Sequence, residues 1–375
     1  MKQKKRILIV FGTRPETIKF APVIQALKAK TDEFETAIAV TGQHREMLHQ
    51  ALAIFAIKPD FDLDIMRANQ DLFDVSIHAL QGLKEVMKEF NPDCVLVQGD
   101  TTSTFIGALA AFYMKAKVGH IEAGLRTFNR WNPFPEEGNR KLTSCVTDLH
   151  FAPTAQSRQN LLGEGYSEAD IFITGNTSID ALLWVLENTQ PEFEKVLTAE
   201  QCEVIEGRFI LLTTHRRENF GKPMEDSLLA VCDIVERHPD VKVVMPVHFN
   251  PNVRSKVDQI LRGNKNIILI EPLDYLNFAH LMGKAELILT DSGGVQEEAP
   301  TLGKPILVLR ETTERPEGIE SGTAKLVGSD RELIVAEASR LLSDKAAYEA
   351  MANKANPYGD GKAAQRIVDA MSTHL

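Results

Sequence analysis

Short runs of apolar residues alternate with longer amphipathic stretches along most of the chain. The first run covers 7–11, and a pattern with helical periodicity follows it after Thr13. Short runs that are apolar throughout are typical of strands buried on both faces, and their alternation with helices is typical of a parallel sheet with helices on both sides. The pattern therefore predicts an α/β fold.

The apolar runs fall into two series, separated by a charged stretch of weak periodicity. The first series predicts strands over 7–11, 36–40, 94–97, 118–121, 150–152 and 171–173. The second series predicts strands over 209–212, 241–245, 267–270, 287–289 and 306–309. Two doubly wound sheets in tandem is the simplest interpretation, with a boundary between Thr174 and Glu206.

Composition and charge exclude several classes of protein. The 375 residues are 43% hydrophobic and 25% charged, which is ordinary for a globular protein. The formal charge of -10, without a long basic block, argues against nucleic acid and anionic membrane as partners. No run approaches the ~18 apolar residues of a membrane span, and the first run is too short for a signal peptide. The four cysteines lie far apart, so we expect no disulfide framework and a cytoplasmic location.

The turn after the first predicted strand is a candidate anion site. Ligands of doubly wound sheets bind beyond the carboxyl ends of the strands. Thr13 and Glu16 form a capping box, and a helix N-terminus with free amides near Arg14 and Lys19 suits an anion. The alternative is a plain capped helix with solvated basic side chains. The turn lacks the G-x-G-x-x-G fingerprint of dinucleotide sites, so no nicotinamide cofactor is expected.

A second candidate anion site follows the predicted strand 287–289. Two glycines in the turn 292–294 let the backbone come close to a phosphate, and the next helix offers its amides. Glu298 could accept hydrogen bonds from ribose hydroxyls, and Arg315 follows the next strand. Because Gly-Gly turns are common, an ordinary tight turn is the alternative.

Three carboxylates and one histidine at strand ends are candidates for proton transfer. Asp100 and Glu122 follow successive predicted strands, and Glu136 lies in the proline-rich loop beyond them. Carboxylates gathered at one cleft are suited to acid and base work. The alternative for Asp100 and Glu136 is that they cap helices. His215 stands beside two arginines and could contact phosphate or act as an acid, although a lone histidine is more often structural. No H-E-x-x-H or C-x-x-C motif is present, so no metal is expected.

Anion sites in both halves and carboxylates in the first half indicate a nucleotide-linked substrate in a cleft between the two sheets. On these residues alone, transfer of the sugar, hydrolysis and rearrangement all stay open.

Eight blocks of sequence resemble the bacterial non-hydrolysing UDP-N-acetylglucosamine 2-epimerases. They are FGTRPE at 11–16, QHREM at 43–47, GDTT at 99–102, HIEAGLR at 120–126, PEE at 135–137, HRRE at 215–218, DSGG at 291–294 and NPYGD at 356–360. The resemblance implies a glycosyltransferase-B-like fold with two Rossmann-like domains, 1–175 and 176–360, and an active site in the cleft between them. It also implies that a final helix, 361–375, returns to the first domain.

The resemblance implies reversible conversion of UDP-GlcNAc to UDP-ManNAc by a homodimer that uses neither metal nor nicotinamide, in cell-surface polysaccharide biosynthesis. It implies catalytic roles for Asp100, Glu122, Glu136 and His215. It implies substrate contacts for Arg14, Lys19, Phe278, Ser292, Gly293, Gly294, Glu298 and Arg315. It implies allosteric activation by UDP-GlcNAc at Gln43, Glu46, Arg216 and His248. Three positions depart from the family pattern: Glu46 and Leu273 stand where some relatives have glutamine, and Gly138 stands where alanine is expected.

The chemistry of the implied reaction favours expulsion of UDP over direct deprotonation. The C2–H bond of a hexose has no adjacent carbonyl, whereas departure of UDP builds positive charge at C1 and acidifies C2–H. The intermediate would be 2-acetamidoglucal. The alternatives are a glycosyltransferase of the same fold, a hydrolysing epimerase that releases ManNAc and UDP, and a nucleotide-sugar sensor without turnover.

Overall fold

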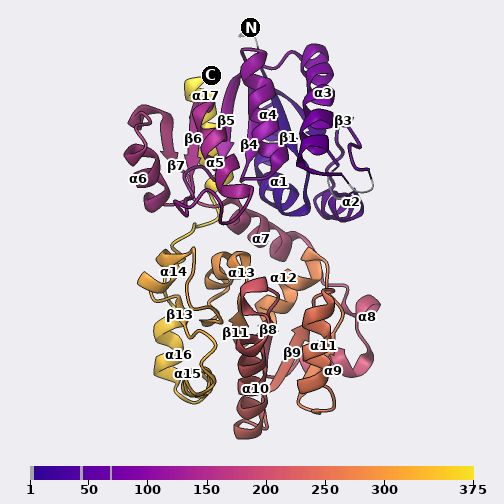
Figure 1. Ribbon diagram of the computed structural model, residues 1–375, viewed down its shortest axis with the longest axis vertical. Helices are drawn as coiled ribbons and strands as arrows, with labels where there is room; N and C mark the ends of the chain where they lie inside the picture. The colour runs from indigo at the N-terminus through magenta and orange to yellow at the C-terminus, as the bar shows by residue number, and fades with distance from the viewer. Residues whose placement is uncertain (1–3, 43–44, 68–69) are drawn as a thin grey trace. The chain divides into compact units, whose positions relative to one another are not determined.

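The computed structural model describes residues 4–42, 45–67 and 70–375. It divides the chain into two compact units, Met1–Leu183 with Gly359–Leu375 and Trp184–Tyr358. Each unit is built on one parallel sheet with helices on both of its faces (Figure 1). Among the described residues, no helix is long and apolar enough to cross a membrane.

Within its described residues, the first unit contains a seven-stranded sheet in the order β3-β2-β1-β4-β5-β6-β7. Its strands are β1 Lys5–Phe11, β2 Phe34–Val40, β3 Phe61–Asp62, β4 Cys94–Gln98, β5 Lys117–Ile121, β6 Leu149–Ala152 and β7 Ile171–Ile173. Its helices are α1 Arg14–Ala29, α2 Arg45–Ile54, α3 Leu72–Phe90, α4 Thr102–Tyr113, α5 Glu136–Cys145, α6 Ala155–Gly163 and α17 Ala363–His374. Helix α7, Thr177–Asn188, begins in this unit and ends in the other.

The second unit, which is described throughout, contains a six-stranded sheet in the order β10-β9-β8-β11-β12-β13. Its strands are β8 Phe209–Thr213, β9 Lys242–Pro246, β10 Ile267–Ile270, β11 Leu287–Thr290, β12 Ile306–Val308 and β13 Ala324–Leu326. Its helices are α8 Phe193–Val196, α9 Ala199–Ile205, α10 Lys222–Arg237, α11 Pro251–Ile260, α12 Tyr275–Lys284, α13 Gly293–Glu298, α14 Pro316–Glu320, α15 Arg331–Ser343 and α16 Lys345–Ala352.

Every strand predicted from an apolar run is present, and the predicted α/β fold with two parallel sheets is confirmed. The strands β1 and β4 at the centre of the first sheet are almost entirely buried, because helices cover both faces. Strands β3 and β13 were not predicted. The first is only two residues long, and Lys325 interrupts the apolar character of the second.

Each sheet reverses its strand order once, between β1 and β4 in the first unit and between β8 and β11 in the second. At such a switch point the crossover helices leave in opposite directions, which opens a crevice at the carboxyl ends of the two strands. Gly12 lies at the first crevice, where an added Cβ would stand 2.1 Å from Thr41 Oγ1 and 2.7 Å from Ser103 Oγ. Only glycine therefore fits between the loop after β2 and helix α4.

Helix α17 closes the first unit. The buried carboxylate of Asp180, in α7, accepts hydrogen bonds from the amides of Ala363 and Ala364 at 3.2 and 2.9 Å. Further along the helix, Lys30 Nζ donates to Asp369 Oδ1 at 2.9 Å and links α17 to the end of α1. The end of the chain is thereby held in the unit that contains its beginning.

Candidate active site

Glu122 follows β5 in a backbone conformation that is uncommon for its type, with φ at 66°. A non-glycine residue in this region costs on the order of 1 kcal/mol, so surrounding contacts must hold it. The carboxylate is 9% exposed, pairs with Lys19 Nζ at 2.5 Å and accepts a hydrogen bond from Gln98 Nε2. The structure thus brings together the predicted catalytic residue Glu122 and the predicted substrate contact Lys19.

Asp100 follows β4 and contacts helix α5. Arg140 Nε and Nη2 donate to Asp100 Oδ2 at 3.0 and 2.7 Å, and Asn139 Nδ2 donates to the Asp100 carbonyl oxygen at 2.9 Å. Arg140 Nη1 also donates to Glu137 Oε2 at 3.0 Å, and the Glu137 side chain is fully buried. The first turns of α5 therefore contain one predicted catalytic residue, Glu136, and bind a second, Asp100, through Asn139 and Arg140.

The helix-cap alternative for Asp100 and Glu136 is wrong. The capping residue of α4 is Thr101, whose side chain accepts from the amide of Thr104, and the residue before α5 is Pro135. Glu136 is half-buried and its carboxylate makes no hydrogen bond or ion pair with the described residues. The Glu136 carboxylate therefore stabilises no contact among the described residues.

Glu16 occupies the first candidate anion site from within the chain. The predicted capping box is confirmed, with Glu16 Oε2 accepting from the amides of Gly12 and Thr13 at 3.0 and 2.8 Å. Its other oxygen accepts from the hydroxyls of Thr101 and Thr104 at 2.7 and 3.0 Å. Burial raises the pKa of Glu16, and these hydrogen bonds oppose the rise. The amides of Gly12 and Thr13 are therefore not free for an anion, because Glu16 already accepts hydrogen bonds from both of them.

The two basic residues of this turn differ in their surroundings. Lys19 is committed to Glu122, whereas Arg14 is half-buried and makes no ion pair with a described residue. Arg14 is therefore the basic side chain at this strand end that is best placed to bind an anion.

The second crevice is organised by the carboxylate of Asp291, which follows β11 and is fully buried. Asp291 Oδ2 accepts from Thr214 Oγ1, His215 N and Arg216 N, each at 2.9 Å. It also accepts from Asn219 Nδ2 at 3.0 Å. One side chain thereby fixes the whole loop that follows β8.

His215 lies between Asp291 and His248. Its Nδ1 is 3.5 Å from Asp291 Oδ1, and its ring stacks on that of His248 with centroids 5.2 Å apart and planes at 14°. Burial lowers the pKa of His215, Asp291 raises it, and His248 and Arg216 lower it further. The net effect is a lowered pKa, which favours the neutral imidazole.

Two of the four predicted allosteric residues, Arg216 and His248, come together around His215. Of the others, Gln43 lies outside the described residues and Glu46 belongs to α2.

Gly293 and Arg315 come together at the start of α13. A Cβ at position 293 would stand 3.0 Å from Arg315 Cζ, so any larger residue would crowd the guanidinium, whereas position 294 faces open space. Arg315 Nε donates to Glu297 Oε1 at 2.9 Å, and Nη1 donates to Glu314 Oε2 at 2.9 Å. The Arg315 side chain is 16% exposed, and its Nη2 also pairs with Glu297 Oε1 at 2.8 Å.

The remaining predicted substrate contacts belong to α12, to α13 and to the residue directly before α13. Ser292 is the capping residue of α13. Glu298 is buried in the same helix and accepts from Tyr275 Oη at 3.4 Å, and Phe278 follows one turn later in α12.

Sequence reasoning missed three side chains that hold the predicted ones, namely Arg140, Asp291 and Glu297. Glu137 and Arg140 are three positions apart, a spacing that places two residues on one helix face, but no helix was predicted over this segment. Glu297 could not be separated from Glu298, because adjacent helical positions point about 100° apart and the pattern does not fix which one faces Arg315.

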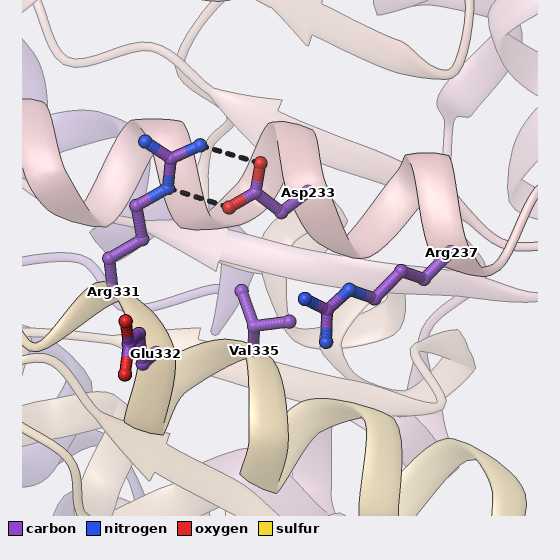
Figure 2. Close-up of a pocket in the computed structure, with 5 residues that line it drawn as sticks. All are labelled: Asp233, Arg237, Arg331, Glu332 and Val335. Atoms are coloured by element: carbon purple, nitrogen blue, oxygen red, sulfur yellow. Dashed lines mark hydrogen bonds and ion pairs between the residues drawn. The ribbon is translucent and has the colours of Figure 1, made fainter.

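A surface pocket lies elsewhere in the second unit, between α10 and α15 (Figure 2). Arg331 Nε and Nη2 both donate to Asp233 at 2.6 Å, and Arg237 extends toward Val335. Its five lining residues include none of those predicted for the site, so this pocket is separate from the chemistry at the strand ends.

Comparison with known proteins shows which family the chain resembles along nearly its whole length. The family model described as UDP-N-acetylglucosamine 2-epimerase matches residues 25–372. The UDP-N-acetylglucosamine 2-epimerase of Yersinia pestis is 53% identical over 372 residues, which cover 98% of this chain and 99% of that protein. The crystal structure of UDP-GlcNAc 2-epimerase from Neisseria meningitidis bound to UDP-GlcNAc is 46% identical, with a TM-score of 0.87, covering 98% of this chain and 100% of that one.

A more distant structure shares the fold alone. The glycotransferase of kitacinnamycin aligns over 100% of both chains with a TM-score of 0.67 at 11% identity. The predicted glycosyltransferase-B-like fold is thereby confirmed.

Proposed function

The chain belongs to the UDP-N-acetylglucosamine 2-epimerase family and is an isomerase, and from this premise we propose that it converts UDP-GlcNAc to UDP-ManNAc by expelling UDP and adding it back. Family membership favours epimerisation over transfer to an acceptor. The observation that supports the proposed mechanism is that the two units carry different kinds of functional group. Carboxylates follow the strands of the first unit, and groups suited to a diphosphate follow those of the second.

The proposed reaction needs two proton transfers and one leaving group. The C1–O bond breaks and UDP departs with the electron pair, and a carboxylate then takes the C2 proton as the C1=C2 double bond of 2-acetamidoglucal forms. Return of a proton to the other face of C2 and of UDP to C1 gives the epimer. No redox equivalent is consumed, so the balance closes with the enzyme's own acids and bases.

The ion pairs of the first unit support ionised carboxylates. Lys19 beside Glu122 and Arg140 beside Asp100 each favour the charged form, which is the form that accepts a proton. Glu136 is the third member, without a cation from the described residues.

The second unit supplies the groups for the leaving diphosphate. We assign this role to His215, Arg315 and the amides of the turn 292–294, because charge develops on the diphosphate oxygens as the C1–O bond breaks. Arg315 already holds Glu297, so its guanidinium is oriented before substrate arrives. Phe278 and Glu298 are assigned to the uracil and ribose.

A proton NMR time course of UDP-GlcNAc in D2O tests the proposal. We expect UDP-ManNAc to appear with deuterium at C2, because the abstracted proton exchanges with solvent, and a parallel reaction in H2O is the control. Free ManNAc with UDP would indicate hydrolysis, absence of an epimer would indicate a transferase or a sensor, and an epimer without deuterium would exclude this mechanism. Started from UDP-ManNAc alone, the same time course shows a lag if UDP-GlcNAc is required as an activator.

We also propose that the chain forms a homodimer through the exposed apolar side chains of α3 and α4. The two helices pack against each other and carry the exposed residues Leu72, Phe73, Ile77, Phe112 and Tyr113. A cluster of exposed apolar side chains is costly to leave in contact with water, so it favours an interface.

Light scattering after size exclusion is expected to give twice the chain mass, and the variant Phe73→Ser with Phe112→Ser should give the monomer. Phe249→Ser, which removes an exposed aromatic of the other unit, is the matched control. A monomeric wild-type protein would contradict the proposal.

A further inference from the structure

We infer that Asp291 is a positioning residue, which sets the His215 imidazole and the loop 214–216 for contact with the diphosphate. The inference rests on the proposed function, since it takes the role of His215 from there. Asp291 itself would touch no substrate atom, because its side chain is fully buried.

The hydrogen bonds of Asp291 converge from one loop. Its carboxylate accepts from two consecutive amides, those of His215 and Arg216, and from the side chains of Thr214 and Asn219. These donors are 72 to 77 positions away in the sequence. Buried donors without an acceptor are costly, so the loop keeps this conformation only while the carboxylate is present.

The position of Asp291 in the sheet links two turns that the proposed function gives to the diphosphate. Asp291 stands at the end of β11, directly before the turn 292–294, and holds the loop after β8, the neighbouring strand at the switch point. Below it, Thr213 Oγ1 and Thr290 Oγ1 are 2.6 Å apart and join the same two strands. One buried carboxylate thereby fixes the distance between the His215 loop and the glycine turn.

The orientation of His215 follows from the same contact. With Nδ1 facing Asp291 Oδ1 at 3.5 Å, Nε2 is the nitrogen left for a diphosphate oxygen. His248 stacks on the ring and Arg216 is the nearby cation, so Asp291 is the negative group that balances a protonated imidazole. A carboxylate in this place selects the tautomer and supports the cation, as in other His–carboxylate pairs.

The test compares Asp291→Asn with wild type in the full-length enzyme. We expect kcat/KM for UDP-GlcNAc to fall about 10- to 100-fold and the Kd of UDP, measured by calorimetry, to rise by about tenfold. The limb of the pH profile that belongs to His215 should move to lower pH, because a negative neighbour that raises the histidine pKa is lost. In a His215→Gln background, Asp291→Asn should cost less than about threefold, since coupled residues are not additive.

Two further variants keep the test decisive. Thr214→Val removes one donor to Asp291 but keeps the charge, and is expected to weaken UDP binding in the same direction by about threefold even if Asp291→Asn does not fold. Asp180→Asn is the matched control, because Asp180 is also buried and accepts two backbone amides in the other unit; it should lower stability and leave the pH profile in place.

Equal losses in the wild-type and His215→Gln backgrounds, or unchanged UDP affinity in both Asp291→Asn and Thr214→Val, would overturn the inference. If the wild-type chain bound UDP without epimerising, the proposed function would fail while the UDP-binding comparison still decided the role of Asp291.

Discussion

Replacing Asp100 by asparagine is expected to lower the turnover of epimerisation by a factor on the order of 10² or more, with UDP affinity nearly unchanged. Asparagine keeps the shape of the side chain and an oxygen for Arg140, but it cannot take or return a proton. UDP contacts are assigned to the other unit, so binding of the leaving group should survive. Steady-state rates from the NMR assay and a UDP titration by calorimetry measure the two quantities.

Arg315→Ala is the matched comparison for Asp100→Asn. It removes a cation assigned to the diphosphate, so it should weaken UDP binding, which Asp100→Asn should not do. Unchanged turnover in Asp100→Asn would remove this carboxylate from proton transfer, and equal losses of UDP affinity in both variants would indicate a general collapse of the site.

The central strands could be predicted because a strand that is buried on both faces has a run of consecutive apolar residues. Strand β1 is apolar after Arg6, β4 is apolar until Gln98 and β8 is apolar until Thr213, so the apolar runs locate these strands directly. Strand β13 contains Lys325 and lies at the edge of its sheet, where burial is incomplete. The sequence signal is therefore strongest for the strands that form the switch points, which are also the strands that position the site.

The site was predictable as a set of positions but not as a set of contacts. The sequence indicates Asp100, Glu122 and Arg315 as site residues. Their partners Arg140, Lys19 and Glu297 lie 18 to 103 positions away and are fixed only by the packing of helices on the sheet. Lys19 illustrates the limit. Counted as a free cation at a helix end, it is in fact the partner of Glu122.

These contacts have a common electrostatic logic. Three ion pairs, Lys19 with Glu122, Arg140 with Asp100 and Arg315 with Glu297, join a group assigned to substrate or catalysis to one of opposite charge. Each pair is partly or fully shielded from water, so neither charge can be left alone without cost. The charged groups are consequently oriented before substrate binds, so they do not have to reorient during the reaction.

Arg140→Leu should show how much of the role of Arg140 concerns the stability of the fold and how much concerns turnover. It leaves Glu137, whose side chain is fully buried, without its cation and frees Asp100 from both of its guanidinium donors. We expect the free energy of unfolding to fall by about 3 kcal/mol, as when one partner of a buried pair is removed. Turnover should fall as well, because Asp100 loses the contact that orients it.

Urea unfolding and steady-state kinetics on the same preparations measure both effects of Arg140→Leu. Arg158→Leu is the matched control, since its partner Glu168 is 74% exposed and such surface pairs contribute less than about 1 kcal/mol. Arg140→Lys keeps the charge but not the planar fork, and should recover more stability than turnover, because Glu137 needs a cation whereas Asp100 needs its position fixed. A stability loss in Arg140→Leu with unaltered turnover would mean that helix α5 supports the fold but does not set the geometry of Asp100.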